Sequence, residues 1–243
     1  MATYKSLKGQ PIQVLTADPP APVEGQVWVV ANPGTASVMK GYALGTGAWA
    51  SGGNLNTKRY GAGGAGVQTA GSLIAGDADG GSPRYGLHEQ YNGSSWTETV
   101  DVNTGGSYMG ATGTQTAAVK FGGSPDRHDE TEIWNGSSWT EVGEMNTARF
   151  GVASVGHTNT SAFAAGGSSG ADATADVVEQ WNGTSWAEVA EINTGRAYFG
   201  GSGLTTAGVV FGGGPEEGKT ETWNGTSWAE VADTNTDERY ALG

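Results

Sequence analysis

The stretch WNGTSWAEVA occurs twice without a single change, at residues 181–190 and again at residues 223–232. Looser copies read YNGSSWTETV at 91–100 and WNGSSWTEVG at 134–143. A catalytic motif is usually needed once in a chain, whereas a stretch that recurs at near-constant spacing is typical of the building unit of a repeat fold. The repeats therefore have to be placed before any residue is considered for chemistry.

The repeat unit pairs a tryptophan with an Asn-Thr dipeptide that follows it seven residues later. The tryptophans are Trp96, Trp139, Trp186 and Trp228, at intervals of 43, 47 and 42 residues, and the asparagines are Asn103, Asn146, Asn193 and Asn235. Trp49 and Asn56 keep the same spacing and indicate a degraded fifth copy. This period is typical of four-stranded propeller blades, because helical arrays would show a 3.6-residue apolar periodicity instead.

Residues 144–190 illustrate the four short strands that each unit predicts. The first is ARFGVASVG (148–156), whose glycines and small side chains suit a crowded central axis. The second, TSAFAAGG (160–167), ends at a double glycine, and the third is VVEQW (177–181). Asn182-Gly183 then predicts a tight hairpin into the fourth strand, SWAEVA (185–190), because an Asn-Gly pair favours positive φ.

The ends of the chain suggest how such blades close into a ring. Complete units span 54–100, 101–143, 144–190 and 191–232, which leaves one first strand in 233–243 and three strands in 25–53, at 26–30, 37–43 and 48–53. The sequence therefore predicts an all-β fold, a five-bladed β-propeller whose composite blade joins 25–53 to 233–243 and so removes open sheet edges. The alternative is an open four-blade array whose ends pair with neighbouring subunits.

Residues 1–24 lie outside this scheme. They contain four prolines and predict an extended N-terminal arm or a disordered tail.

Composition excludes several classes of function. The net charge is −13, with 25 acidic and 12 basic residues, so the surface repels phosphate backbones and we expect no nucleic-acid partner. The chain has no cysteine, which excludes disulfides, thiolate nucleophiles and Cys-ligated metals. The N-terminal sequence lacks the apolar core of a signal peptide, and no stretch approaches the length of a membrane span. We therefore expect synthesis in the cytoplasm without export or membrane insertion.

The double glycines, the aromatic residue of the third strand and the tryptophan of the fourth resemble the kelch motif. Several stretches in their order, VEGQVW, KGYALGTGAWASGGNLNT, the NTARFG-like segments and WNGTSWAEV, resemble kelch-like propeller proteins of tailed bacteriophages, especially marine cyanophages. This resemblance implies a non-enzymatic virion protein of a tail fibre, appendage or capsid decoration, which serves assembly and host-surface contact. Its partners would be other virion proteins and a host glycan or protein, and Ile12, Val14 and Leu15 would fix the N-terminal arm to the particle. Two departures are Ala75-Gly76-Asp77 in place of a double glycine and Gly106 where other repeats carry arginine.

Few residues suggest a metal or a catalytic centre, and we expect no cofactor. The kelch resemblance also brings in galactose oxidase, whose copper site needs a cysteine that this chain lacks, and His88, His128 and His157 occupy unlike repeat positions. Arg59, Arg149 and Arg196 recur in register, with Arg239 one place later. They could form a sialidase-like cluster, but recurrence favours a structural pairing with an acidic or carbonyl group of the neighbouring blade. Asp77-Ala78-Asp79 lacks the further ligands of a calcium loop, and the N-x-S/T sites coincide with hairpin turns.

The connection between the second and third strands varies most among the repeats, at 77–88, 124–129, 168–176 and 214–220. In an up-and-down blade these loops and the connections between blades emerge on one face, which is how binding surfaces are commonly built. The candidate contact residues there are Arg84, Tyr85, Arg127, His128 and Lys219. Unselected loop variation is the alternative explanation. A free-standing lectin-like glycan-binding propeller is the second functional hypothesis, and an enzyme is a distant third.

Overall fold

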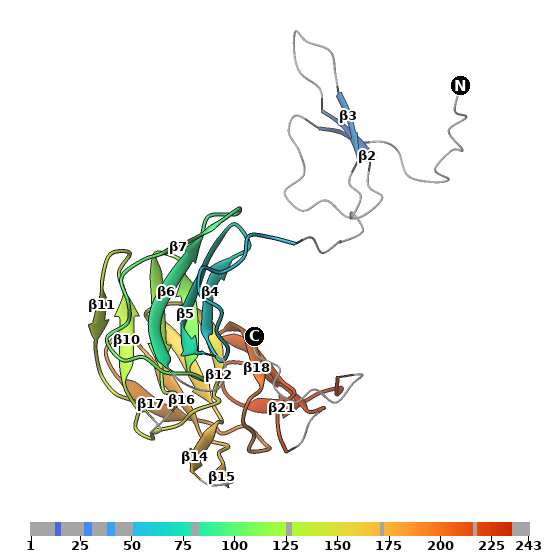
Figure 1. Ribbon diagram of the computed structural model, residues 1–243. Helices are drawn as coiled ribbons and strands as arrows, with labels where there is room; N and C mark the ends of the chain where they lie inside the picture. The colour runs from blue at the N-terminus through green and yellow to red at the C-terminus, as the bar shows by residue number, and fades with distance from the viewer. Residues whose placement is uncertain are drawn as a thin grey trace. The chain divides into compact units, whose positions relative to one another are not determined.

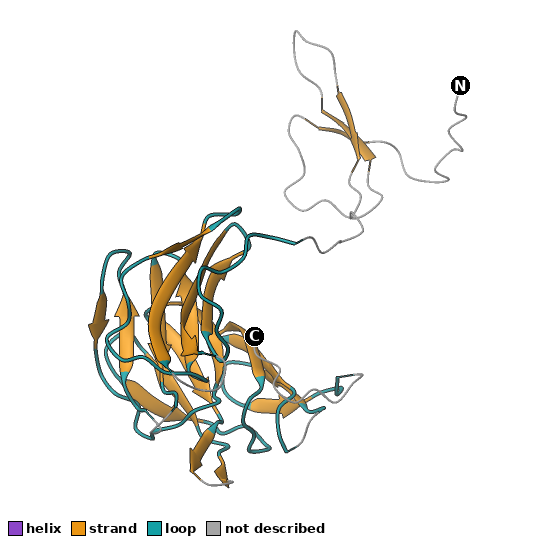
Figure 2. Ribbon diagram, viewed as in Figure 1, coloured by secondary structure: helices purple, strands orange, loops and turns teal. Residues whose placement is uncertain are grey.

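The computed structural model describes residues 13–15, 27–30, 38–41, 51–78, 83–124, 128–170, 173–215 and 218–234. Over these residues the chain consists of strands, turns and loops without a helix, as predicted (Figure 2). The chain divides into two compact units, Met1–Ser51 and Gly52–Gly243. This division does not coincide with the boundary expected after residue 24.

The larger unit contains four sheets, each of four antiparallel strands paired in chain order (Figure 1). The first sheet comprises β4 (Gly63–Val67), β5 (Ala70–Asp77), β6 (Arg84–Tyr91) and β7 (Trp96–Glu98). The second comprises β8 (Gly110–Thr114), β9 (Ala117–Phe121), β10 (Thr131–Trp134) and β11 (Trp139–Glu141). The third comprises β12 (Ala153–Thr158), β13 (Ser161–Ala165), β16 (Val178–Trp181) and β17 (Trp186–Val189). The fourth comprises β18 (Gly200–Leu204), β19 (Ala207–Phe211), β20 (Thr220–Trp223) and β21 (Trp228–Glu230).

Each sheet lies inside one of the four predicted repeat units. In the third sheet, strands two to four match the predicted ranges, but the first begins at Ala153 rather than at residue 148. The residues before it form a connection in which Phe150 makes an isolated bridge to Ser168. Ser168 belongs to the connection between β13 and β16, which holds an unpredicted hairpin, β14 (Ser168–Gly170) with β15 (Ala173–Thr174).

The innermost strands β4, β8, β12 and β18 lie side by side in chain order, in a propeller-like arrangement (Figure 1). The described sheets do not form a closed ring. Small residues permit this close approach, as expected: a Cβ on Gly63 would lie 2.6 Å from the Cβ of Ala111, and one on Gly201 would lie 2.6 Å from the Ser154 carbonyl oxygen.

The hairpin between the third and fourth strands corrects one expectation. Trp181 pairs with Trp186, so the turn contains four residues rather than the Asn-Gly pair alone. Gly183 has a φ of 93°, while Asn182 acts through its side chain, whose Oδ1 accepts the backbone N–H groups of Thr184 and Ser185 at 2.9 Å. An asparagine side chain that bonds its own backbone two residues on is an Asx turn. The motif is therefore turn chemistry, as predicted, by a different mechanism.

Packing between the sheets explains the repeated tryptophans. Trp139, Trp186 and Trp228 are each 6% exposed, and each packs against the sheet that precedes its own. Trp186 meets Phe121 with ring centroids 4.9 Å apart, and Trp228 meets Phe163 at 6.2 Å. The prediction that these indoles belong to the core between blades is confirmed.

The smaller unit has one sheet in the order β1 (Gln13–Leu15), β2 (Val27–Val30), β3 (Val38–Gly41). β2 and β3 pair antiparallel, as expected for strands at 26–30 and 37–43. β1 lies inside the segment expected as an arm and pairs parallel with β2, with Val14 opposite Val29 and Leu15 opposite Val30. Ile12, Trp49 and residues 235–243 lie outside the described residues.

Candidate functional site

Each sheet of the larger unit holds one buried glutamate that is paired with a cation. The pairs are Arg59–Glu89 at 2.5 Å, Lys120–Glu132 at 2.9 Å, Arg149–Glu179 at 2.8 Å and Arg196–Glu221 at 2.9 Å. The acidic partner expected for the recurring arginines is therefore present, but its expected place in the neighbouring blade is wrong. Arg149 turns back onto its own sheet, where it also donates to the carbonyls of Gly166 and Val177.

The same glutamate explains the Asn-Thr pair of the repeat. Glu179 accepts the backbone N–H of Asn146 at 2.6 Å, the Asn146 side-chain amide at 2.8 Å and the backbone N–H of Thr147 at 3.3 Å. Equivalent bonds join Asn56, Asn103 and Asn193 to the glutamates of their own sheets. The carboxylate therefore fixes the connection that leads into each innermost strand.

Burial and hydrogen bonding act in opposite directions on these ion pairs. Burial alone would raise the pKa of Glu89, but the Asn56 N–H and the Arg59 guanidinium outweigh it, so the pKa lies below the usual value. Burial lowers the pKa of Arg149 and of Arg196, and Glu179 and Glu221 oppose this effect. A buried carboxylate that is paired and accepts several N–H groups is a structural element rather than a proton donor.

The second sheet keeps the ion pair with different residues. Gly106 stands where the other sheets have arginine, and the cation is supplied by Lys120 on β9 instead. Lys120 lies opposite Glu132 across the strand pair and also donates to the Thr104 carbonyl at 2.9 Å. The equivalent positions, opposite the glutamates of the other sheets, are Leu73, Ala164 and Val210. One cation per sheet is thus retained although its place in the sequence changes.

Four aromatic rings, which we name the axial aromatic cluster, come from the connections just before the innermost strands. They are Tyr60, Tyr108, Phe150 and Tyr198. Ring centroids are 6.2 Å apart for Tyr60 and Tyr108, 5.2 Å for Tyr108 and Tyr198, and 5.9 Å for Phe150 and Tyr198. Tyr60 is 39% exposed and the other three are half-buried, so part of the cluster faces solvent.

Two of these tyrosines have an unusual backbone. Tyr108 and Tyr198 have φ of 54° and 58°, at the position that Gly61 and Gly151 occupy in the first and third sheets. Their N–H groups donate across sheets, Tyr108 to the Gly61 carbonyl at 2.7 Å and Tyr198 to the Gly151 carbonyl at 2.8 Å. A bulky residue with positive φ is a real outlier, and such strain often occurs where ligands bind.

The connections that carry the aromatics are bridged to the segments between the second and third strands, where the predicted contact residues were placed. The bridges are Tyr60–Asp77, Ser107–Ser124, Phe150–Ser168 and Ala197–Gly214. The expectation that both kinds of loop share one face is therefore confirmed. We call this side of the larger unit the loop face.

Each described basic candidate on the loop face is paired with an acid of its own sheet. Arg84 Nε lies 3.9 Å from Asp77 Oδ1, His128 Nδ1 lies 2.8 Å from Glu130 Oε2, and Lys219 Nζ lies 2.8 Å from Glu230 Oε1. Tyr85 follows Arg84 on β6 and is half-buried. These candidates belong to three different sheets, and Arg127 lies outside the described residues.

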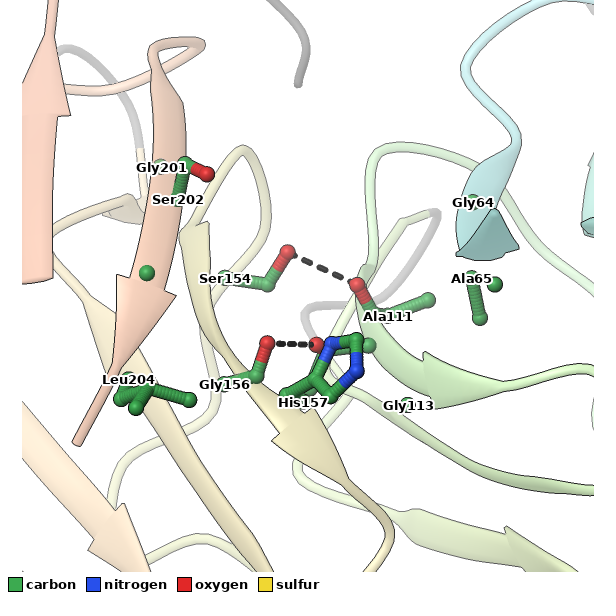
Figure 3. A pocket seen from close by; sticks show the side chains of 13 residues that line it. Gly64, Ala65, Ala111, Gly113, Ser154, Gly156, His157, Gly201, Ser202 and Leu204 are labelled. Carbon is green, nitrogen blue, oxygen red and sulfur yellow. Dashed lines mark hydrogen bonds between the residues drawn. The ribbon is translucent and has the colours of Figure 1, made fainter. Parts of the chain in front are cut away.

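A cavity of about 350 Å³ opens along the innermost strands, towards the ends opposite the loop face (Figure 3). Its walls come from all four sheets, at Gly64–Gly66, Ala111–Gly113, Ser154, Gly156, His157 and Gly201–Leu204. Two hydrogen bonds join its neighbouring strands, from Ser154 Oγ to the Ala111 carbonyl at 2.8 Å and from Thr112 Oγ1 to the Gly156 carbonyl at 2.7 Å. His157, exposed, is the one titratable side chain among these lining residues.

Sequence reasoning did not identify the glutamates, although they leave a signal. The third strands read HEQY, TEIW, VEQW and TETW, with glutamate at the same place in each. The axial aromatic cluster was harder to find, because its members alternate between two adjacent positions from one sheet to the next.

Comparison of the chain with protein-family models and with curated proteins finds no match. Within the described part of the chain, no group of three or more histidine, aspartate and glutamate side chains could hold a metal ion. A search of those same residues for a helix long and apolar enough to cross a membrane also finds none.

Proposed function

We propose that the chain is a non-enzymatic structural protein of a phage virion, part of a tail fibre, appendage or capsid decoration, which serves assembly and host-surface attachment. The observation that carries this proposal is the contrast between four sheets built on one plan and loops that differ on a single face. A uniform scaffold with diverse loops is how binding surfaces are commonly built. The resemblance of the motif order to phage kelch-like proteins supports the same function.

The proposal is tested by locating the protein. Purified virions of the phage that encodes this chain should contain it at a fixed ratio to the major capsid protein, as measured by quantitative mass spectrometry. A chain found only in the lysate, and absent from washed particles, would contradict the virion function.

For the fold we infer a fifth, composite blade from residues 25–53 and 233–243. Two half-buried faces support this inference. In the second, third and fourth sheets, one face packs against the sheet before it; the same face of the first sheet carries Tyr91 and Trp96, which are half-buried. In the first three sheets, the other face packs against the sheet after it; the same face of the fourth sheet carries Val209 and Phe211, also half-buried. One further blade would cover both faces. The open array with neighbouring subunits on these faces is the alternative.

Closure has a direct test by truncation. Removing residues 233–243 takes away the inferred first strand of the composite blade, so we expect the melting temperature to fall by many degrees and the variant to self-associate. Unchanged melting and monodispersity would contradict a five-bladed ring.

The N-terminal segment is proposed to fix the protein to the particle through Ile12, Val14 and Leu15. An extended segment can dock by backbone hydrogen bonds and apolar side chains, and β1, at the edge of the sheet it forms with β2 and β3, is such a segment. Complementing a phage that lacks the gene with a chain lacking residues 1–24 tests this function. The truncated chain should fold but be missing from particles.

A lectin-like glycan-binding propeller is the second candidate, and the axial aromatic cluster favours it. Partly exposed aromatic rings can stack on sugar rings, and the predicted contact residues Arg84, Tyr85 and His128 would then bind hydroxyl groups. A glycan array probed with the full chain and with Tyr60→Ala would detect such binding. Signals that are lost in the variant would support the lectin function.

A further inference from the structure

The hairpin between the third and fourth strands of each sheet places an asparagine directly before a glycine. The four asparagines are exposed, and they are Asn92, Asn135, Asn182 and Asn224. Asparagine before glycine is open to attack by the main chain on the asparagine side chain, because glycine has no Cβ to shield its own nitrogen. Since the four hairpin sequences are nearly identical, a difference in this chemistry among them must come from the fold.

The turn prepares the side-chain carbonyl of each asparagine for such an attack. In all four hairpins the asparagine Oδ1 accepts the backbone N–H groups two and three residues further on, at 2.9–3.0 Å. Two N–H donors on a carbonyl oxygen stabilise the negative charge that develops there when a nucleophile adds to its carbon. The nucleophile would be the nitrogen of the following glycine, whose N–H makes no hydrogen bond to the described residues.

The first hairpin differs from the other three in the contacts of its two serines. Ser94 Oγ donates to Asn92 Oδ1 at 3.0 Å and Ser95 Oγ does so at 3.5 Å, in addition to the two N–H groups. The equivalent oxygen has one hydroxyl donor in the second hairpin and none in the third and fourth. The carbonyl of Asn92 is therefore the most strongly polarised of the four.

The amide nitrogen of the same side chain is also held differently. Nδ2 donates to a serine hydroxyl at 3.2 Å from Asn135 and at 3.3 Å from Asn182 and Asn224. In the first hairpin both serine hydroxyls donate to Oδ1 instead, and Asn92 Nδ2 has no acceptor among the described residues. A nucleophile adds perpendicular to the plane of an amide, so the side chain has to rotate before it reacts. An amide held at both ends resists this rotation, whereas Asn92 can pivot about its oxygen.

We propose that Asn92 is a site of spontaneous deamidation, which reacts several-fold faster in the folded chain than the asparagines of the other three hairpins. The Gly93 nitrogen bonds to Asn92 Cγ and the Cγ–Nδ2 bond breaks. The Gly93 amide hydrogen leaves with the side-chain nitrogen as ammonia, and the product is a cyclic imide. Water then adds to either carbonyl carbon of the imide, so the opened ring is aspartate or isoaspartate.

The two products act differently on the hairpin. Aspartate keeps an oxygen atom where the N–H groups of Ser94 and Ser95 donate. Isoaspartate instead adds a methylene to the main chain between Tyr91 and Trp96, which pair across the turn. Both products add a negative charge. The first hairpin is thus the one whose charge and geometry change as the protein ages.

The test is to keep the folded full chain at mildly alkaline pH and to quantify the acid form of each hairpin peptide over time by mass spectrometry. Electron-transfer fragmentation separates isoaspartate from aspartate. A parallel sample in concentrated urea is the control, because the four sites have almost the same neighbours in the sequence and should react at similar rates without the turn. We expect Asn92 to lead several-fold in the folded chain and to lose this lead in urea.

Two serine variants separate the effect of the oxygen donors from that of the amide contact. Ser94→Ala removes one hydroxyl donor and should slow Asn92 several-fold, towards the rate of Asn182. Ser138→Ala removes the acceptor of Asn135 Nδ2 and should accelerate Asn135. Both serines are exposed, so both variants should fold, as checked by an unchanged melting temperature.

Three outcomes would overturn the proposal. The four sites could react at equal rates in the folded chain. Asn92 could lead by the same factor in urea, which would place the cause in the sequence rather than in the turn. The rates at Asn92 and Asn135 could also stay unchanged in Ser94→Ala and Ser138→Ala, which would show that these hydrogen bonds do not control the reaction.

Discussion

The second and third sheets differ from the first and fourth in how completely the same repeat is buried. Phe121 in the second sheet is fully buried, whereas its equivalent Phe211 in the fourth is half-buried. Trp186 in the third sheet is 6% exposed, whereas Trp96 in the first is half-buried. The sequence of the repeat is nearly the same in both regions, so the difference comes from the neighbours that each sheet has.

Two kinds of contact follow from this comparison. The ion pair of glutamate with arginine or lysine lies within one sheet and is equally buried in all four. The indole contact lies between two sheets and is complete only where a preceding sheet is present. Variants of the first kind should behave alike in every sheet, and variants of the second kind should report on closure.

The largest effect is expected from removing a buried carboxylate. Glu179→Ala removes the carboxylate from the buried Arg149 guanidinium and the acceptor from the N–H groups of Asn146 and Thr147. Breaking a buried ion pair from one side costs about 3–5 kcal/mol, and we expect the upper end of that range. Glu89→Ala in the first sheet should cost the same, as measured by urea denaturation. A much smaller cost in the first sheet would show that the ion pair does not depend on contacts within its own sheet alone.

The second sheet supplies a matched control for this prediction. Arg149→Gly combined with Ala164→Lys transfers the arrangement of Gly106 and Lys120 into the third sheet. The lysine should restore a cation to Glu179, so the double variant should be more stable than Arg149→Gly alone. If the second substitution adds further destabilisation, the two arrangements are not interchangeable.

Substitution of the tryptophans tests the other half of the comparison. Trp139→Ala, Trp186→Ala and Trp228→Ala should each cost about 3–5 kcal/mol, because each leaves a large cavity between sheets. In the full chain Trp96→Ala should cost nearly as much, since the composite blade is proposed to cover it. In a chain lacking 233–243 the cost of Trp96→Ala should fall sharply, while that of Trp186→Ala should not. Equal costs in both chains would show that nothing in 233–243 helps to cover Trp96.

The repeat explains how far sequence reasoning could go. Spacing of Trp96, Trp139, Trp186 and Trp228 located all four sheets, because each strand is specified by residues close to it in the chain. In the second sheet Gly106 replaces the arginine and Lys120 supplies the cation. This could not be predicted in the same way, since it depends on Lys120 facing Glu132 across β9 and β10. The positive φ of Tyr108 and Tyr198 could not be predicted for a similar reason, because it accompanies hydrogen bonds from their N–H groups to carbonyls of neighbouring sheets.

A pH effect should arise at His88, which lies between the first and second sheets. Burial, with a smaller effect of Arg59, lowers the pKa of His88 from 6.5 to about 4. Unfolded chains therefore bind a proton below pH 6.5 that the folded chain excludes, so stability present above pH 6.5 is lost as the pH falls towards 4. The loss between pH 7 and pH 4.5 should be about 2–3 kcal/mol. Denaturation at pH 7 and pH 4.5 measures it together with a smaller loss from Glu89, whose pKa is lowered by folding, because carboxylates of the unfolded chain begin to bind protons in this range.

The control for this effect is His88→Thr. Threonine occurs at the equivalent position in the second sheet, where Thr131 accepts the Trp186 indole N–H, as His88 Nδ1 accepts that of Trp139 at 3.3 Å. The variant should fold and should lose most of the difference between pH 7 and pH 4.5. A pH dependence that persists unchanged would assign it to other groups.

The smallest effect expected is a gain in stability in the third sheet. Trp228 Nε1 is buried and has no hydrogen-bond partner among the described residues, where the acceptor position holds Val178 rather than threonine or histidine. Threonine has nearly the shape of valine, so Val178→Thr should place a hydroxyl where Thr131 meets Trp186, without a new cavity. A hydrogen bond that satisfies a buried donor contributes about 1 kcal/mol. Thr131→Val should have the opposite sign, since it leaves the Trp186 N–H unpaired. Urea denaturation of both variants decides the point: if Val178→Thr is less stable than the natural chain, the indole of Trp228 does not reach the hydroxyl, and the equivalence of the three acceptor positions fails at the third sheet.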